Sequence, residues 1–348
     1  MKKIAYIEID THAEIAQDFM DLMHDSGEIS VDYYFSEKIK NQLRENGESV
    51  YITDSSMILD QLSDRKYDLI IIGTVHRYFN IFFEIFQKYN AAVIIHNINF
   101  SKISKFSLIK NTFKADFIYR LKLWSKEGLF YTKETYAKAK NHLVLDHELC
   151  SEKYRLLPIF YTKSFNKTES EILIIVVPGG VSQKRRDYHR IFKTIRNLDI
   201  KNNIIFVFLG KAKGEELKNL KNLSRIIPGN ITLQYFSERV SSDVFDGWMK
   251  KADVLWCPIQ EEAEFFSQKE IYGKTKMTGN LGDAIKYGKP AVFPSNYSSE
   301  LDFIIPEEEN LIEQFQNLKN IVFDFQKNFS REKIQKDLEN LLNELIST

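Results

Sequence analysis

The chain has 348 residues, and its 48 Lys and Arg balance its 48 Asp and Glu, so the formal net charge is zero. This length predicts two domains, and a neutral chain offers no overall positive charge for binding nucleic acid. The two cysteines, Cys150 and Cys257, lie far apart and form neither a CxxC pair nor a zinc-ligand spacing, which is typical of the reducing cytosol.

In the first half of the chain, apolar runs alternate with amphipathic stretches, which predicts a parallel sheet covered by helices on both faces. The first apolar run breaks at Glu8 and Asp10, so we expect a strand there rather than a signal segment. No apolar stretch reaches the roughly 18 residues that a membrane-spanning helix needs. Predicted strands cover residues 4–9, 32–35, 50–52, 68–73, 91–96, 142–145 and 156–158, and predicted helices cover 13–23, 56–62 and 81–89.

The polar stretch 162–170 lacks periodicity and is interpreted as a linker, after which the same pattern restarts. We therefore expect an α/β chain with two Rossmann-like, doubly wound domains that face each other across a cleft. The predicted boundaries are 1–163 and 171–328 for the two domains and 329–348 for a C-terminal helix that packs back toward the first. Predicted strands of the second half cover 172–177, 204–209, 231–235, 254–258 and 291–294, and predicted helices end at 195 or cover 241–250 and 330–345.

The stretch 274–294 predicts a loop, a short helix and a buried strand. Thr278 and Gly279 stand where the helix begins, and the free backbone N–H groups at such a position can bind an anion. Lys276 adds a positive charge for phosphate, and Asp283 adds a carboxylate for ribose hydroxyls about one turn into the helix. The pattern favours a nucleotide site, and the alternative is an ordinary helix start with a glycine stop.

A second candidate phosphate site follows the strand predicted at 172–177. Gly179 and Gly180 allow a tight turn and a close approach of the backbone to a ligand. Lys184 and Arg185 come soon after them and can meet a diphosphate. The stretch matches neither GxGxxG nor GxxxxGK[ST], so no standard dinucleotide or P-loop motif is present. Its alternative interpretation is a solvated, basic helix start.

Polar residues of the first half stand where strands end, at the edge that lines a cleft in this architecture. Asp10 and His12 follow the first strand, and either can be the general base that deprotonates an acceptor hydroxyl in an inverting enzyme. In a retaining enzyme they would bind sugar hydroxyls instead, and helix capping is the alternative role. His96 ends another predicted strand, where a structural histidine is the alternative.

Residues 100–124 combine basic and aromatic side chains, with Asp116 as the only acid. Such a segment can lie on an anionic membrane surface and bring the protein to a lipid-linked acceptor. The alternatives are a helix that packs its aromatic residues into the first domain and, disfavoured by the neutral net charge, a nucleic-acid surface. The aromatic members are Phe100, Phe106, Phe113, Phe117, Tyr119 and Trp124, and the basic ones are Lys102, Lys105, Lys110, Lys114, Arg120 and Lys122.

The order and spacing of these parts resemble the GT-B glycosyltransferases, especially their family 4-like group. The stretch LGDAIKYGKPAVFP resembles the group's LEAMA-x-GKPVV signature, which implies a ribose contact for Asp283. The glycine turn at 178–188 resembles the turn that receives the donor diphosphate. Gly210 and Lys211 resemble the glycine turn after the next strand, and the resemblance implies that the backbone around Phe236 faces the nucleobase.

Two positions depart from the family pattern. Thr275 stands where the first glutamate of the E-x7-E motif is expected, and Gly180 stands where an arginine often follows the turn glycine. Glu270 precedes the phosphate loop and can supply an alternative carboxylate to the donor sugar, or else is a plain surface carboxylate. The resemblance also implies a donor-sugar contact for His96 and retention of the anomeric configuration.

The sequence therefore predicts a glycosyltransferase with the GT-B fold. It would move a sugar from a UDP- or GDP-linked donor to a glycan or lipid-linked glycan in envelope polysaccharide or glycolipid assembly. We expect no separate cofactor and no metal, because the donor domain lacks the D-x-D motif of metal-dependent transferases. The expected location is cytoplasmic and peripheral at the inner face of the membrane. The alternatives are a nucleotide-sugar epimerase of similar architecture and a catalytically inactive partner subunit.

Overall fold

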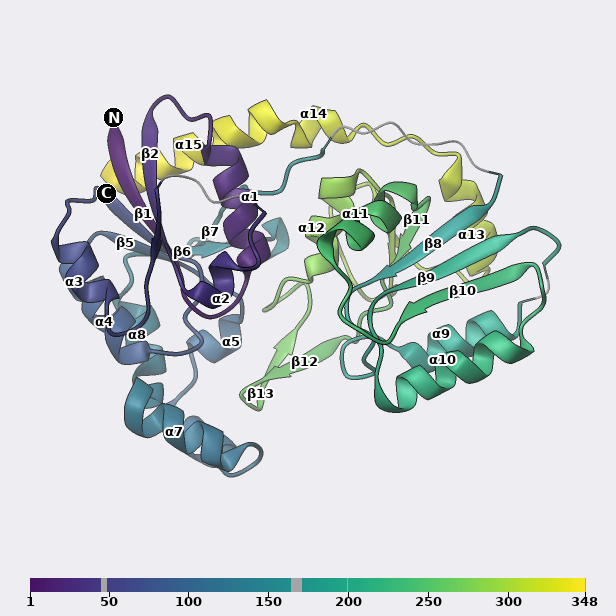
Figure 1. Ribbon diagram of the computed structural model, residues 1–348, viewed down its shortest axis with the longest axis horizontal. Coiled ribbons are helices and arrows are strands. Elements are labelled where there is room, and N and C mark those ends of the chain that lie inside the picture. Colours follow the sequence, from purple (N-terminus) through teal and green to yellow (C-terminus); the bar gives the residue numbers. More distant parts are fainter. Residues whose placement is uncertain (45–48, 164–170, 199, 348) are drawn as a thin grey trace.

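The computed structural model describes residues 1–44, 49–163, 171–198 and 200–347, which form two sheet-and-helix units (Figure 1). Most of the predicted linker, residues 164–170, lies outside the described residues. The larger sheets have seven and six strands, and every neighbouring pair in them is parallel. The predicted fold class, two doubly wound α/β domains, is confirmed.

The first sheet has the strand order β3-β2-β1-β4-β5-β6-β7. Its central strand β1 is buried on both faces, because Ile4 and Tyr6 pack into one apolar layer whereas Ala5 and Ile7 pack into the other. The strands are β1 (Lys2–Glu8), β2 (Ile29–Phe35), β3 (Val50–Ile52), β4 (Leu69–Ile72), β5 (Ala91–Ile94), β6 (Asn141–Val144) and β7 (Tyr154–Leu156).

Helices cover both faces of this sheet. Phe19 of α1 packs with Tyr6 on one face, and Phe82 of α4 packs with Ile7 on the other. The helices of this domain are α1 (Ala13–Met23), α2 (Glu37–Lys40), α3 (Ile58–Ser63), α4 (Phe79–Lys88), α5 (Ile98–Ser101), α6 (Lys105–Thr112), α7 (Phe117–Glu127), η1 (Leu129–Tyr131), α8 (Thr132–Lys138) and η2 (His147–Leu149).

The second sheet has the order β10-β9-β8-β11-β14-β15, and a separate antiparallel hairpin, β12–β13, extends from the same domain. The strands are β8 (Leu173–Pro178), β9 (Ile204–Lys211), β10 (Ile231–Phe236), β11 (Val254–Trp256), β12 (Glu262–Phe265), β13 (Gln268–Ile271), β14 (Ala291–Phe293) and β15 (Ile304–Pro306). The helices are α9 (Tyr188–Arg196), α10 (Gly214–Ile226), α11 (Ser242–Lys251), α12 (Gly279–Tyr287), α13 (Leu311–Lys319) and α14 (Phe325–Phe329).

The C-terminal helix α15 (Arg331–Ser347) returns to the first domain, so that both termini lie there (Figure 1). Leu338 and Leu342 are fully buried in the same apolar layer as Ile4. Lys2 Nζ donates a hydrogen bond of 2.7 Å to Asn343 Oδ1, and Ser26 Oγ donates one of 2.6 Å to Glu339 Oε1. The helix therefore ties the end of the chain to the sheet with which the chain begins.

Candidate functional site

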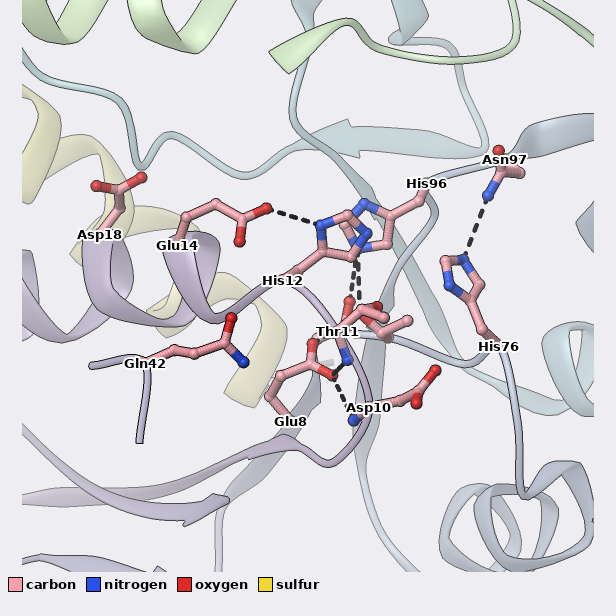
Figure 2. A network of polar contacts seen from close by, with 12 residues as sticks. Glu8, Asp10, Thr11, His12, Glu14, Asp18, Gln42, His76, His96 and Asn97 are labelled. Carbon is pink, nitrogen blue, oxygen red and sulfur yellow. Dashed lines mark hydrogen bonds and ion pairs between the residues drawn. The ribbon is translucent and has the colours of Figure 1, made fainter. Parts of the chain in front are cut away.

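Three histidines from different loops meet at the carboxyl edge of the first sheet (Figure 2). They follow β1, β4 and β5, which are neighbours in the sheet, so the loops after them open side by side. The rings of His12 and His96 stack with centroids 4.0 Å apart, and His76 lies 6.0 Å from His12 and 5.8 Å from His96. The predicted residues His12 and His96 are thus brought together, and His76 joins them.

His12 is held by a strained backbone and by an acidic partner. It precedes α1 with φ 64°, a left-handed conformation that is rare for residues other than glycine, and its side chain does not cap the helix. Its Nδ1 lies 3.0 Å from Glu14 Oε1. Burial opposes ionisation of Glu14, but the hydrogen bond and charge of His12 outweigh burial and lower the carboxyl pKa. This pair leaves the second ring nitrogen of His12 for chemistry.

A buried carboxylate that the sequence analysis did not single out lies beneath this loop. Glu8 is fully buried; it accepts hydrogen bonds of 3.2 Å from the backbone N–H groups of Asp10 and Thr11 and one of 2.6 Å from Thr74 Oγ1. Burial raises the pKa of Glu8 to about 7, although these hydrogen bonds act in the opposite direction. Glu8 therefore shapes the loop that presents Asp10 and His12.

The two deeper histidines are neutral. Burial lowers the pKa of both His76 and His96 well below the usual value, and the nearby charge of His12 acts in the same direction. His96 Nε2 lies 2.8 Å from the carbonyl oxygen of Gly73, so this nitrogen carries the proton and donates it. The Nδ2 of Asn97 donates to His76 Nε2 over 3.2 Å. Each ring therefore keeps only its Nδ1 for a sugar hydroxyl, as an acceptor in His96 and as a donor in His76.

In the second domain, the turn after β8 lies against the carboxyl end of β9, where Gly210 is the next-to-last residue of the strand rather than part of the turn expected from the sequence. A Cβ atom at Gly210 would lie 2.3 Å from the carbonyl oxygen of Gly179, so only glycine fits there. Gly179 has φ 93°, and a Cβ at that position would meet the guanidinium of Arg186. A Cβ at Gly180, by contrast, has no atom within 4 Å, which shows open space beside the turn.

Arg186 joins this turn to the start of α12. It is buried, and it donates to Asn280 Oδ1 over 2.9 Å and to the carbonyl oxygen of Gly180 over 3.3 Å. Asn280 was not predicted as a site residue. The only signal for it in the sequence is a polar residue next to Gly279 at the start of an otherwise apolar helix. The predicted cations Lys184 and Arg185 are exposed and precede α9.

The helix α12 begins at Gly279, where the sequence predicts a helix start. Thr278 is the N-cap, and its side chain accepts a hydrogen bond from Asn280 N. A Cβ at Gly279 has no atom within 4 Å, so open space lies beside this turn as well. Asp283 accepts a hydrogen bond of 3.3 Å from Asn280 Nδ2, and burial raises its carboxyl pKa to about 6.

Two other predicted donor residues stand at the carboxyl ends of β9 and β10. Lys211 Nζ lies 3.1 Å from Glu238 Oε2 at the surface. The carbonyl oxygen of Phe236 accepts a hydrogen bond of 2.8 Å from Ala212 N, and its ring is half-buried. Phe236 pairs with Lys211, which directly follows Gly210 at the end of β9.

Lys276 links the two halves of the site. Its Nζ donates a hydrogen bond to Asn97 Oδ1 in the first domain, beside the histidines. Burial lowers the pKa of Lys276 to about 8. This contact brings the loop before α12 against the loop that carries the histidine His96.

A cavity of about 180 Å³ lies between the domains on the side of α1 and α12. Glu14 and Asp18 line it from the first domain, and Lys286 and Arg239 line it from the second. Lys286 Nζ donates to Asp18 Oδ2 over 2.8 Å, and its positive charge also acts on Asp283. Asp283, the predicted ribose-binding carboxylate, does not itself line this cavity.

Glu270 lies apart from the glycine turns. Its side chain is 0 % exposed, so the interpretation as a plain surface carboxylate is wrong. Its two carboxylate oxygens accept hydrogen bonds from the backbone N–H groups of Asn99 and Phe100 in the first domain. Burial raises the pKa of this carboxyl group. Both oxygens are therefore engaged by the opposite domain.

The basic, aromatic segment forms α6 and α7, which project from the first domain (Figure 1). Phe100 is buried and Trp124 packs on Phe130, as the packing alternative predicts. Other aromatic and aliphatic side chains of this segment are exposed to solvent. The exposed fractions are 77 % for Phe106, 67 % for Phe113 and 82 % for Ile118, and Ile109, Phe117, Tyr119 and Leu121 are also exposed.

Within the described residues, no helix has the length and apolar character needed to cross a bilayer. In the same part of the chain, no group of three or more His, Cys, Asp or Glu side chains is arranged to hold a metal ion.

A scan against protein-family models and a search of curated proteins found no match. Solved structures do match over nearly the whole chain. Sucrose-phosphate synthase from Thermosynechococcus elongatus has a TM-score of 0.59 at 12% identity, covering 100% of both chains. Anabaena Alr3699/HepE in complex with UDP has a TM-score of 0.60 at 10% identity, covering 99% of this chain and 100% of that one.

The lipopolysaccharide outer core galactosyltransferase WaaB in its apo form has a TM-score of 0.56 at 10% identity, covering 98% of this chain and 99% of that one. At such low identities these likenesses concern the fold. Together with the two parallel sheets, they show that the chain has the GT-B fold of glycosyltransferases.

Proposed function

We propose that the protein is a glycosyltransferase that uses a nucleoside-diphosphate sugar and needs no metal. The acceptor would be a glycan or lipid-linked glycan of an envelope polysaccharide or glycolipid. The observation that carries this proposal is the convergence of the glycine turn after β8, the end of β9 at Gly210 and the start of α12. Arg186 joins the turn to α12, and open space borders Gly180 and Gly279. Backbone N–H groups and flanking cations in such a place suit a diphosphate.

The donor would lie along the second domain. Lys184, Arg185 and Lys276 would contact the diphosphate, and Asp283 would bind the ribose hydroxyls. The backbone around Phe236 and Lys211 would face the nucleobase. UDP or GDP is the proposed nucleotide, and UDP is supported by the fold likeness to a protein whose structure holds UDP.

The chemistry would take place between Lys276 and the histidine cluster. As the bond from the sugar to the diphosphate breaks, negative charge grows on the leaving phosphate, where the cations and the amides near Thr278 stabilise it. The acceptor oxygen would bond to the anomeric carbon of the sugar, and its proton would pass to the leaving phosphate in a retaining reaction or to His12 in an inverting one. The family resemblance favours retention, in which His12, His96 and Asp10 bind sugar hydroxyls; the His12–Glu14 pair also offers a base that an inverting reaction would use.

The lipid-linked acceptor is supported by α6 and α7. Their exposed apolar side chains are interspersed with lysines, as in segments that bind an anionic membrane surface. Such a surface would hold the acceptor cleft near lipid-linked glycans at the inner face of the membrane.

A turnover assay with UDP- and GDP-sugars and a lipid-linked acceptor extract tests this function. We expect nucleoside diphosphate to be released only when acceptor is present, with the labelled sugar appearing in the acceptor fraction. His12→Ala should reduce turnover at least tenfold, whereas His24→Ala, a change at an exposed histidine just after α1, should not. Conversion of the donor sugar without acceptor would indicate an epimerase, and binding without turnover would indicate an inactive partner subunit; either result contradicts the proposal.

A further inference from the structure

The hairpin β12–β13 of the second domain reaches across to the first domain (Figure 1). It lies in the chain just ahead of the loop that carries Lys276 and Thr278. Its strand β13 packs against α5, which follows β5 and the histidine His96. The hairpin is therefore an interdomain element next to the proposed site.

Glu270 on β13 makes the central contact. Asn99 N donates to its Oε2 over 3.2 Å, and Phe100 N donates to its Oε1 over 2.8 Å. Because the side chain is fully buried, removing its oxygens would leave two backbone N–H groups without these acceptors in a water-poor place. Burying a carboxylate is costly unless hydrogen bonds compensate for the lost water, and here the compensation comes from the other domain.

Thr275 extends the same contact. Its carbonyl oxygen accepts a hydrogen bond of 2.9 Å from Ile98 N, and its hydroxyl oxygen accepts one of 2.8 Å from Ile271 N. Asn99 Nδ2 donates to the carbonyl oxygen of Lys269 over 3.0 Å. The position at which the family pattern has an acid is thus used here to dock the two domains.

The tip of the hairpin adds aromatic contacts. Phe265 packs on His76 with centroids 4.4 Å apart, and Phe266 stacks on Phe100 at 5.2 Å. Arg120 Nη1 donates to Ser267 Oγ over 3.0 Å. Phe266 and Ser267 have φ values of 48° and 56°, which cost free energy in residues other than glycine. Contacts with the first domain offset this strain.

We propose that Glu270 is a positioning residue, which clamps the hairpin onto the backbone of Asn99 and Phe100 and so holds Lys276 against Asn97 beside the histidines. This inference rests on the proposed function, because it assigns the clamp a role in sugar transfer. Loss of Glu270 removes no proposed diphosphate contact, but it loosens the placement of Lys276 against Asn97. It should therefore slow transfer far more than it weakens nucleotide binding.

The test compares Glu270→Ala and Glu270→Gln with Glu264→Ala, a change at an exposed carboxylate on the same hairpin. Without any ligand, we expect amide hydrogen exchange of peptides covering 97–101 and 262–276 to become at least tenfold faster in Glu270→Ala. Glu270→Gln keeps one oxygen acceptor and should show a smaller increase, and Glu264→Ala should match the wild type.

In the turnover assay, Glu270→Ala should lower kcat at least tenfold with the donor KM within about threefold of the wild type, and Glu270→Gln should recover part of the rate. Unchanged exchange in Glu270→Ala overturns the clamp. A selective loss of affinity for the nucleotide sugar over the free nucleotide also overturns it, because it would place Glu270 on the donor sugar. The exchange measurement needs no donor. It therefore tests whether Glu270 holds the hairpin on the first domain even if the protein transfers no sugar.

Discussion

Glu8 is the residue whose environment differs most from what its position in the sequence indicates. It ends a buried strand, and burial raises its carboxyl pKa from the usual 4.5 to about 7. A folded-state pKa above the unfolded one means that the protonated form favours folding. The contribution of Glu8 to stability is therefore fully present below pH 4.5 and is lost as the pH rises through about 7.

Glu8→Gln removes this titration, so the free energy of unfolding of the variant should rise relative to the wild type between pH 5 and pH 8. The change should be about 3 kcal/mol, because the pKa of Glu8 differs between the folded and the unfolded protein and each pKa unit corresponds to a fixed free energy. Urea unfolding at a series of pH values measures it. Asp283 and Asp146, whose carboxyl pKa values are also raised to about 6, are present in both proteins and cancel in the comparison. A difference independent of pH would contradict the assignment.

At the scale of single residues, several residues selected from the sequence lie near one another in the structure. His12 and His96 stack, and Lys276 bonds to Asn97, the neighbour of His96. Two partners of selected residues were missed: Glu14, which bonds to His12, is a common helix-start acid, and Asn280, which bonds to Asp283, lies in an apolar run. Their roles depend on contacts across the chain, which local pattern does not contain.

Half of the exposed large hydrophobic side chains among the described residues lie on α6 and α7 or between them. Replacing Phe106, Phe113 and Ile118 together by alanine should reduce binding to vesicles containing phosphatidylglycerol at least fivefold, because these side chains would enter the acyl boundary. Vesicle sedimentation measures this binding. The wild type should bind neutral phosphatidylcholine vesicles more weakly, since the lysines contribute only on an anionic surface.

The matched control is a double alanine change at Ile226 and Val322, which are 60 % and 93 % exposed but lie in the second domain. This control should bind the vesicles as the wild type does. Equal binding by the triple variant and the wild type would contradict a membrane role for α6 and α7.

Helices and strands were predicted correctly from the sequence where the periodicity of apolar residues was strong. The helix predicted at 13–23 has the bounds of α1, and the strand predicted at 50–52 has those of β3. The hairpin β12–β13 was missed, because its strands are short and polar and its turn contains Phe266 and Ser267 rather than glycine or asparagine. Only its docking on α5 explains why it forms, and docking lies beyond local pattern.

At the scale of the whole molecule, the two sheets place one set of loops opposite the other. The restart of the α/β pattern predicted this, but not the contacts that close the cleft. Lys276 with Asn97, Glu270 with α5, and Lys286 with Asp18 all join residues more than 150 positions apart. A nucleotide bound to the second domain would thus lie under residues of the first.

The nucleotide site itself is tested most directly by thermal unfolding with UDP, GDP, CMP and dTDP at millimolar concentration. We predict that UDP or GDP raises the melting temperature by a few degrees, because a ligand that binds only the folded state stabilises it. Asp283→Ala and Lys276→Ala should each lose most of that shift, and Lys221→Ala, at an exposed position of α10, should keep it. No shift with any nucleotide, or an unchanged shift in both site variants, would contradict the account.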